Sequence, residues 1–176
     1  GICRDTETSE LGQNILDKVI RNSQIAQQTN LPICQDTGSV LVFADIGQDV
    51  HIINKNFESA VEEGVRAAYK EGYLQNSIVA DPVARKNTND NTPAIIHTRI
   101  VEGDQLRLAV MPKGGGAENM SVLRMLTPSE GWEGVAKLVI ETVRNAGANL
   151  CPPIIVGVGI GGTFDSVASI AKRALL

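Results

Sequence analysis

The chain has 176 residues, of which 43% are hydrophobic and 20% are charged, and this composition is typical of one globular domain. The formal net charge is −4 and the Lys and Arg residues are scattered, so the sequence lacks the clustered positive charge of a nucleic-acid surface or a basic membrane patch. The longest apolar run, residues 154–160, contains two glycines and is much shorter than the roughly 20 residues of a membrane span. We therefore expect no nucleic-acid partner and no membrane partner.

The two ends of the chain and its cysteines indicate the cellular compartment of the protein. The chain begins at Gly1 without the charged and then apolar segment of a secretory leader, and it ends in an apolar helical pattern, so we interpret it as a fragment of a cytoplasmic protein. Its three cysteines are Cys3, Cys34 and Cys151. This odd number disfavours a disulfide scaffold and favours free or metal-binding thiols.

The first half of the chain predicts two helices and one strand. Apolar residues recur at helical spacing behind the capping residue Ser9, which predicts a helix of about 18 residues that fades near Thr29. Residues 39–46 are apolar enough for a strand that is buried on both faces. A second helical stripe runs over residues 57–69, with an asparagine before it and a glycine behind it.

The second half begins with a polar, turn-rich segment, residues 74–93. Two alternating runs, residues 94–101 and 106–111, are joined by Glu102-Gly103-Asp104 and predict a β-hairpin. The remaining expected elements are a short helix over residues 119–126, a helix capped by Ser129 and stopped by Gly147, a buried strand over residues 154–158, and a last helix capped by Thr163. These elements predict a single mixed α/β (α+β) domain with a mixed sheet, one β-hairpin and about five helices.

Two cysteines lie in rigid loops. Cys34 stands beside an amide and a carboxylate in Pro32-Ile33-Cys34-Gln35-Asp36-Thr37-Gly38, and Cys151 precedes Pro152-Pro153. Such a cysteine serves as a nucleophile, a metal ligand or a small buried hydrophobic residue. Two rigidly held thiols suit a metal or cluster that demands fixed ligand geometry. Zinc is disfavoured because the chain has no C-x-x-C pair and its two histidines, His51 and His97, lie in strand-like runs.

Two glycine-rich segments bear on ligand binding. Lys113-Gly114-Gly115-Gly116 lacks the ending of a Walker loop, but its backbone N–H groups suit a carboxylate, with a flexible turn as the alternative. Residues 157–162 match the pattern G-x-G-x-x-G. Only 14 residues follow Gly162, however, too few for the acidic residue that a dinucleotide site requires.

Four motifs together resemble a known family. They are Pro32-Ile33-Cys34-Gln35-Asp36-Thr37-Gly38, then Asn87-Thr88 with Asn91-Thr92-Pro93, then Lys113-Gly114-Gly115-Gly116 with Glu118-Asn119-Met120-Ser121, and last Cys151-Pro152-Pro153 with residues 157–163. In this order, and over nearly the whole chain, they resemble the class I, iron–sulfur-dependent fumarate hydratase and tartrate dehydratase family. The likeness is to its α subunit or N-terminal domain.

The resemblance implies a [4Fe-4S]-dependent hydro-lyase that hydrates fumarate reversibly to L-malate, or alternatively the α subunit of an L(+)-tartrate dehydratase. Cys34 and Cys151 match two of the three cysteines that hold the cluster in the family, and the third is expected outside this chain. Cys3 matches no ligand position, and we interpret it as structural.

The resemblance also implies substrate contacts and partners. Gln35, Asp36, Gly116 and Asn119 match substrate-contacting positions, with Asp36 also the candidate proton donor or acceptor, and Lys113 is included beside them as a substrate-binding candidate. The family's remaining catalytic groups belong to its β portion, so the expected partners are a β subunit or C-terminal domain, a C4 dicarboxylate substrate and further copies in a homo-oligomer. Gln75 stands near the position where some relatives carry a substrate-binding arginine.

Two non-enzymatic functions remain as alternatives to the hydro-lyase. A non-catalytic nucleotide-binding module built on residues 157–162 predicts nucleotide affinity without any cluster. An assembly domain predicts dimerisation without chemistry of its own.

Overall fold

The computed structural model describes residues 1–151 and 154–176. The chain divides into two compact units, residues 1–35 and residues 36–176. The described part contains six α-helices and three strands, which confirms a mixed α/β fold with a mixed sheet. Within this part no helix combines the length and the apolar character that crossing a membrane requires.

The first unit is a pair of helices. α1 (Ile2–Thr6) precedes α2 (Glu10–Thr29), and the Arg4 guanidinium donates to both carboxylate oxygens of Asp17 at 2.9 and 3.2 Å. The Ser9 hydroxyl accepts a hydrogen bond from the Gly12 amide at the start of α2. The predicted helix and its predicted cap are therefore confirmed.

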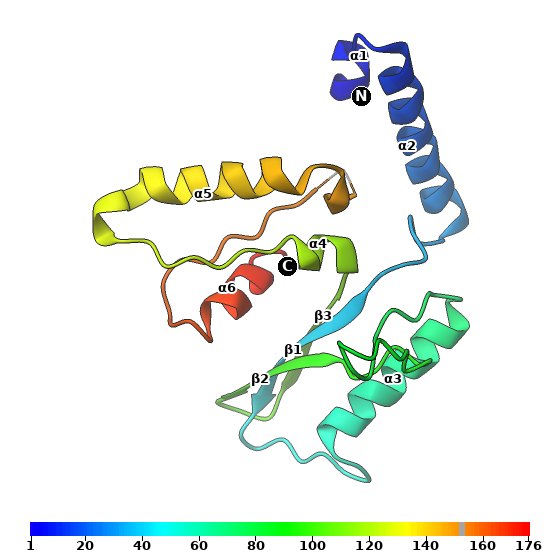
Figure 1. Cartoon of the computed structure of the whole chain (residues 1–176). Helices are drawn as coiled ribbons and strands as arrows, with labels where there is room; N and C mark the ends of the chain where they lie inside the picture. Colours follow the sequence, from blue (N-terminus) through cyan, green and yellow to red (C-terminus); the bar gives the residue numbers. More distant parts are fainter. Residues whose placement is uncertain (152–153) are drawn as a thin grey trace. The chain divides into compact units, whose positions relative to one another are not determined.

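The second unit is built on a three-stranded sheet in the order β2-β1-β3 (Figure 1). The central strand β1 (Ser39–Gly47) runs parallel to β2 (Ile95–Val101) and antiparallel to β3 (Leu106–Lys113). Residues 40–44 of β1 are all buried, with at most 6% of their surface exposed. The predicted strand that is covered on both faces is thus confirmed.

β2 and β3 do not form the predicted hairpin. β1 lies between them, and the connecting residues pass the end of β1, where the Gly47 amide donates to the Gln105 carbonyl at 2.9 Å and the Gln48 amide to the Val101 carbonyl at 2.8 Å. β1 takes the central place because it is apolar on both faces, whereas β2 and β3 keep exposed side chains. The short connection alone was a misleading signal for direct pairing.

α3 (Phe57–Glu71) forms the main core with one face of the sheet. Its Val65 and Tyr69 pack with Val40 and Val42 of β1. The Asn56 side chain accepts from the Ser59 amide at 2.7 Å, and Gly72 is the C-cap, so the second predicted helix is confirmed together with the residues expected at its ends. The helix thereby places the Tyr69 hydroxyl near the chain segment that enters β1.

The next helices are α4 (Gly115–Asn119) and α5 (Gly131–Ala146), with the 3-10 turns η1 (Pro128–Glu130) and η2 (Gly147–Leu150) at the ends of α5. The predicted helix over residues 119–126 is wrong, because α4 begins within the glycine run and ends at Asn119. Gly147 ends α5 with a positive φ of 52°, as predicted. The N-cap of α5 is Glu130 instead of Ser129. Thr127 is the N-cap of η1, where its amide and hydroxyl both donate to the Glu130 carboxylate.

The chain ends with α6 (Val167–Arg173). The strand predicted over residues 154–158 is wrong, because residues 154–160 carry no regular secondary structure and pair with no strand of the described sheet. The N-cap of α6 is Ser166. Thr163 lies one turn earlier, and its carbonyl accepts from the amides of Ser166 and Val167 at 3.1 and 3.0 Å.

Candidate active site

The Asp36–Gly38 turn at the start of β1 is held by polar contacts from three distant segments. The Asp36 Oδ1 accepts hydrogen bonds from the Gly38 amide at 3.1 Å and from the Ser77 hydroxyl at 2.7 Å. The Gly38 carbonyl accepts from Asn91 Nδ2 at 2.9 Å and from the Tyr69 hydroxyl at 3.2 Å. The turn therefore has a defined shape although Asp36 itself is exposed.

The glycine loop after β3 packs directly on this turn. Gly38 has a φ of +67°, and a Cβ at this position would collide with the Lys113 carbonyl and stand 2.7 Å from the Gly115 nitrogen and 2.8 Å from the Gly114 Cα. Only glycine allows both the positive φ and the close backbone approach. The structure thus brings the Asp36–Gly38 turn together with the Lys113–Gly115 segment through Gly38, although the two motifs are far apart in the sequence.

The same glycine loop also contacts the segment before Cys151. A Cβ on Gly116 would stand 2.7 Å from the Asn149 carbonyl oxygen. Cys151 follows two residues later in a left-handed conformation with a φ of 51°. The predicted rigid prolines Pro152 and Pro153 lie outside the described residues.

Lys113 and Asn119 flank this loop in different ways. Only 14% of the Lys113 side chain is exposed, and its Nζ lies 3.6 Å from Glu118 Oε2. Lys172 of α6 approaches the other oxygen of Glu118 at 2.7 Å. Lys113 therefore forms an ion pair with Glu118. Asn119, in contrast, is exposed and lines a cavity of about 280 Å³ between the end of α4 and α5.

The two proposed cluster ligands and Gln35 fall on different sides of the division between the units. Cys34 and Gln35 are exposed residues of the first unit, and Cys151 is an exposed residue of the second. That the two thiols come together at one cluster stays a prediction. Among residues 1–151 and 154–176, no three His, Cys, Asp or Glu side chains gather into a metal-binding group.

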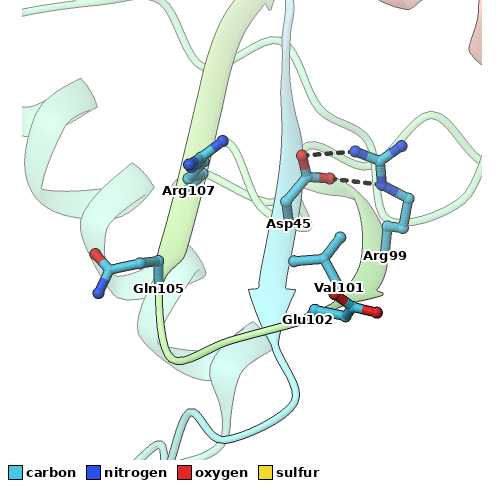
Figure 2. Close-up of a pocket in the computed structure, with 6 residues that line it drawn as sticks. All are labelled: Asp45, Arg99, Val101, Glu102, Gln105 and Arg107. Atoms are coloured by element: carbon cyan, nitrogen blue, oxygen red, sulfur yellow. Dashed lines mark hydrogen bonds and ion pairs between the residues drawn. The ribbon is translucent and has the colours of Figure 1, made fainter.

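A second cavity, of about 220 Å³, lies at the other end of the sheet (Figure 2). Its centre is the ion pair in which Arg99 donates to both oxygens of Asp45 at 3.0 and 2.9 Å, with Arg107 on the neighbouring strand. The hydrogen bonds from Arg99 hold the pKa of the Asp45 carboxyl below its usual range. Asp45 lies seven positions beyond Gly38 along the strand, or about 23 Å away, so this cavity is remote from the Asp36 turn.

The glycines of residues 157–162 serve helix packing. A Cβ on Gly157 would collide with the Ala171 carbonyl of α6, and a Cβ on Gly159 would stand 2.8 Å from the Ala171 nitrogen. In the part of the chain that the structure describes, no strand leads into this segment, whereas a dinucleotide fingerprint requires one. This geometry argues against the nucleotide-binding module.

Sequence reasoning missed three residues that shape the site: Ser77, Asn91 and Glu118. Ser77 lies in the polar, turn-rich segment over residues 74–93. Asn91 and Glu118 belong to the family motifs, which give neither residue a role of its own. The available signal was the density of asparagine and threonine over residues 87–92, but a local pattern does not reveal a partner 53 positions away.

The sequence of the chain is similar to those of known proteins. The family model described as "Fumarate hydratase (Fumerase)" matches residues 2–176. The chain is 42% identical over 177 residues to the "Putative L(+)-tartrate dehydratase subunit alpha" of Methanocaldococcus jannaschii, covering 97% of this chain and 61% of that protein. It is 33% identical over 176 residues to the "L(+)-tartrate dehydratase subunit alpha" of Escherichia coli K12, covering 98% and 58%.

The chain therefore spans about three fifths of the length of these relatives. The family match covers almost every residue, including the turn, the glycine loop and the segment before Cys151. The chain belongs to the fumarate hydratase (Fumerase) family.

Proposed function

We propose that the chain is the α portion of a [4Fe-4S]-dependent hydro-lyase that hydrates fumarate reversibly to L-malate. The observation that carries the proposal is the packing of the Asp36–Gly38 turn on the Lys113–Gly115 loop, which continues onto Asn149. Parts of three of the four family motifs, at Gly38, Asn91 and residues 113–115, thereby meet at one place in the second unit, and the fourth motif begins two residues after Asn149. A set of motifs that served only local folding would not need to converge in this way.

The residues present fit the cluster that the family implies. Cys34 and Cys151 are free and exposed, and thiolate sulfur is the ligand that iron–sulfur clusters take. Cys34 precedes Asp36 by two residues and Cys151 follows Asn149 by two, so each cysteine Cα stays within about 7 Å of a residue at the packed loops. We infer that these two cysteines hold two irons and that a cysteine outside this chain holds a third. When bound, the cluster supplies a Lewis-acidic iron that polarises the substrate carboxylate and hydroxyl.

The chain's own residues would bind the diacid and move the proton. Asp36 is the proposed proton donor or acceptor, because its Oδ1 is fixed by two hydrogen bonds while its Oδ2 has no hydrogen-bond partner in residues 1–151 and 154–176. Gln35, Gly116 and Asn119 are proposed substrate contacts. Lys113 is proposed to bind the substrate as well, although its amine also faces Glu118.

L(+)-tartrate is the second candidate substrate. The relatives at 42% and 33% identity carry the name of the tartrate dehydratase α subunit, and this favours tartrate specifically. Both reactions add or remove water on a C4 dicarboxylate, so the same proton-transfer group serves either. Gln75, two residues before Ser77, is the position to compare between enzymes of the two specificities.

A β subunit or C-terminal domain is the proposed partner, because the relatives are named as α subunits. We also propose a homo-oligomer and a cytoplasmic location. The three cysteines of the described chain are free, and free thiols persist in a reducing compartment.

The test is anaerobic reconstitution of the complete enzyme, with this chain, the segment carrying the third cysteine and the β partner. We expect a brown protein that hydrates fumarate, and the ratio of kcat/KM for malate and L(+)-tartrate dehydration decides between the substrates. Cys34→Ser and Cys151→Ser should lose the cluster absorbance and the activity, while Cys3→Ser is the matched control that keeps both. A colourless, inactive wild-type enzyme, or full activity in either ligand variant, would overturn the proposal.

A further inference from the structure

Four hydrogen bonds close a ring around the Asp36 carboxylate. The Ser77 hydroxyl donates to Asp36 Oδ1 at 2.7 Å, and the Ser77 amide donates to Asn91 Oδ1 at 2.7 Å. Asn91 Nδ2 donates to the Gly38 carbonyl at 2.9 Å, and the Gly38 amide returns to Asp36 Oδ1 at 3.1 Å. The ring links three separate parts of the sequence, the Asp36–Gly38 turn, Ser77 and Asn91.

Asn91 is the fixed point of this ring. Its exposed fraction is 0%, and its amide group uses the acceptor on Ser77 and a donor on Gly38. A buried amide that is paired at both ends holds one orientation, because turning it would leave buried polar groups without partners. Asn91 therefore fixes the backbone of both Ser77 and Gly38.

The Ser77 hydroxyl holds a side chain, whereas Asn91 holds the backbone. It reaches the side chain of Asp36, while the turn itself is already held by Asn91 and by the Tyr69 hydroxyl. Removing only the Ser77 hydroxyl leaves those anchors in place. Only the Gly38 amide would then hold Asp36 Oδ1, so the carboxylate would leave its present rotamer more readily.

We propose that Ser77 is a positioning residue that holds Asp36 Oδ1 so that Oδ2 faces the substrate. The inference rests on the proposed function, in which Asp36 exchanges a proton with the diacid. A hydrogen bond to a charged group is the stronger kind, and proton transfer depends on the distance and angle of the transferring oxygen. Loss of the bond should therefore affect the chemical step more than the binding of substrate.

The kinetic test uses the complete, cluster-loaded enzyme with Ser77→Ala, Asp36→Ala and the double variant. We expect Ser77→Ala to lower kcat about 10- to 100-fold with KM changed less than about twofold. In the Asp36→Ala background, Ser77→Ala should have no further effect on kcat, because its target is gone. Ser59→Ala removes an exposed hydroxyl of α3 and serves as the matched control, with kcat unchanged.

The structural test compares crystal structures of the wild-type and Ser77→Ala complexes. We expect one Asp36 rotamer in the wild type and a different or divided rotamer in the variant. An unchanged Asp36 rotamer, an unchanged kcat, or an equal fall of kcat in the Asp36→Ala background would each overturn the positioning role. A wild-type complex that is inactive on both diacids would instead contradict the proposed function. The rotamer comparison would still decide whether Ser77 positions Asp36.

Discussion

The side chain of Asn91 donates a hydrogen bond to the main-chain carbonyl of Gly38 at 2.9 Å, across 53 positions of sequence. This contact ties the polar segment before β2 to the turn before β1. The two strands are parallel neighbours, so the bond fixes the point at which both enter the sheet. The turn that carries Asp36 is thus fixed to the sheet and is not part of a free loop.

Replacing Asn91 with alanine should destabilise the fold. The change removes two hydrogen bonds of a fully buried amide and leaves the half-buried Ser77 amide and the buried Gly38 carbonyl without this partner, so we expect a loss of about 2–4 kcal/mol in the free energy of unfolding. The control is Asn54→Ala, because Asn54 also has a positive φ but is exposed. Urea denaturation followed by circular dichroism measures the free energy of unfolding of both variants. Equal losses of this free energy in the two variants would contradict the role given to the buried Asn91 amide.

Gly38→Ala tests the contact between the turn and the glycine loop. The left-handed φ costs a residue with a Cβ about 1–2 kcal/mol, and here the Cβ also meets the backbone of Lys113 and Gly115. We expect a total loss of about 2–4 kcal/mol in the free energy of unfolding. Gly161→Ala is the control, since Gly161 has a φ of +81° and open space around its Cα. If both variants unfold at the same denaturant concentration, the close packing of the two loops is refuted.

Local signals predicted the first helices and their caps well. Ser9 and Asn56 each accept a hydrogen bond from an amide three residues later, which is a purely local interaction visible in the sequence. The strand over residues 39–46 was also predictable, because a continuous apolar run must be covered on both faces. These features depend only on neighbours along the chain.

Long-range choices escaped the same reasoning. The pairing of β2 and β3 with β1 depends on which strand is buried most completely, and a short connection such as residues 102–105 fits a hairpin equally well. α4 begins at Gly115, and its Glu118 lies between Lys113 and Lys172, of which Lys172 is 54 positions away. The site was predictable in its motifs, whereas the contact of Ser77 with Asp36 required the fold.

Asp90 should titrate at unusually low pH. The hydrogen bond from Arg66, at 2.8 Å, and two bonds from Thr92 lower the pKa of the Asp90 carboxyl to about 2. A depressed pKa stabilises the fold above the unfolded value near 3.8, and this contribution disappears as the pH falls toward about 2. Carboxyl NMR titration should give a higher Asp90 pKa in Arg66→Gln, while Arg4→Gln, which removes the partner of Asp17, should leave it unchanged. An unmoved Asp90 pKa in Arg66→Gln would rule out the ion pair as the cause.

His97 should make the fold sensitive to mild acid. Its ring stacks on Phe43 with centroids 4.9 Å apart, and its Nε2 is buried without a hydrogen-bond partner in the part of the chain that the structure describes. Burial, and then the charge of Lys172, lower the pKa of this imidazole below the ordinary value of 6.5. The unfolded chain therefore binds a proton more readily than the folded chain, so stability is complete above about pH 6.5 and falls as the pH drops through the interval between the two pKa values.

The variant His97→Phe keeps an aromatic ring on Phe43 and removes the titrating group. Its free energy of unfolding should vary less between about pH 7 and pH 5 than that of the wild type. The control is His51→Gln, because His51 is exposed in the loop after β1, and this variant should keep the wild-type pH dependence. Denaturant unfolding at several pH values gives the free energy of unfolding as a function of pH. If this free energy falls as steeply with pH in His97→Phe as in the wild type, protonation of another group weakens the fold in acid.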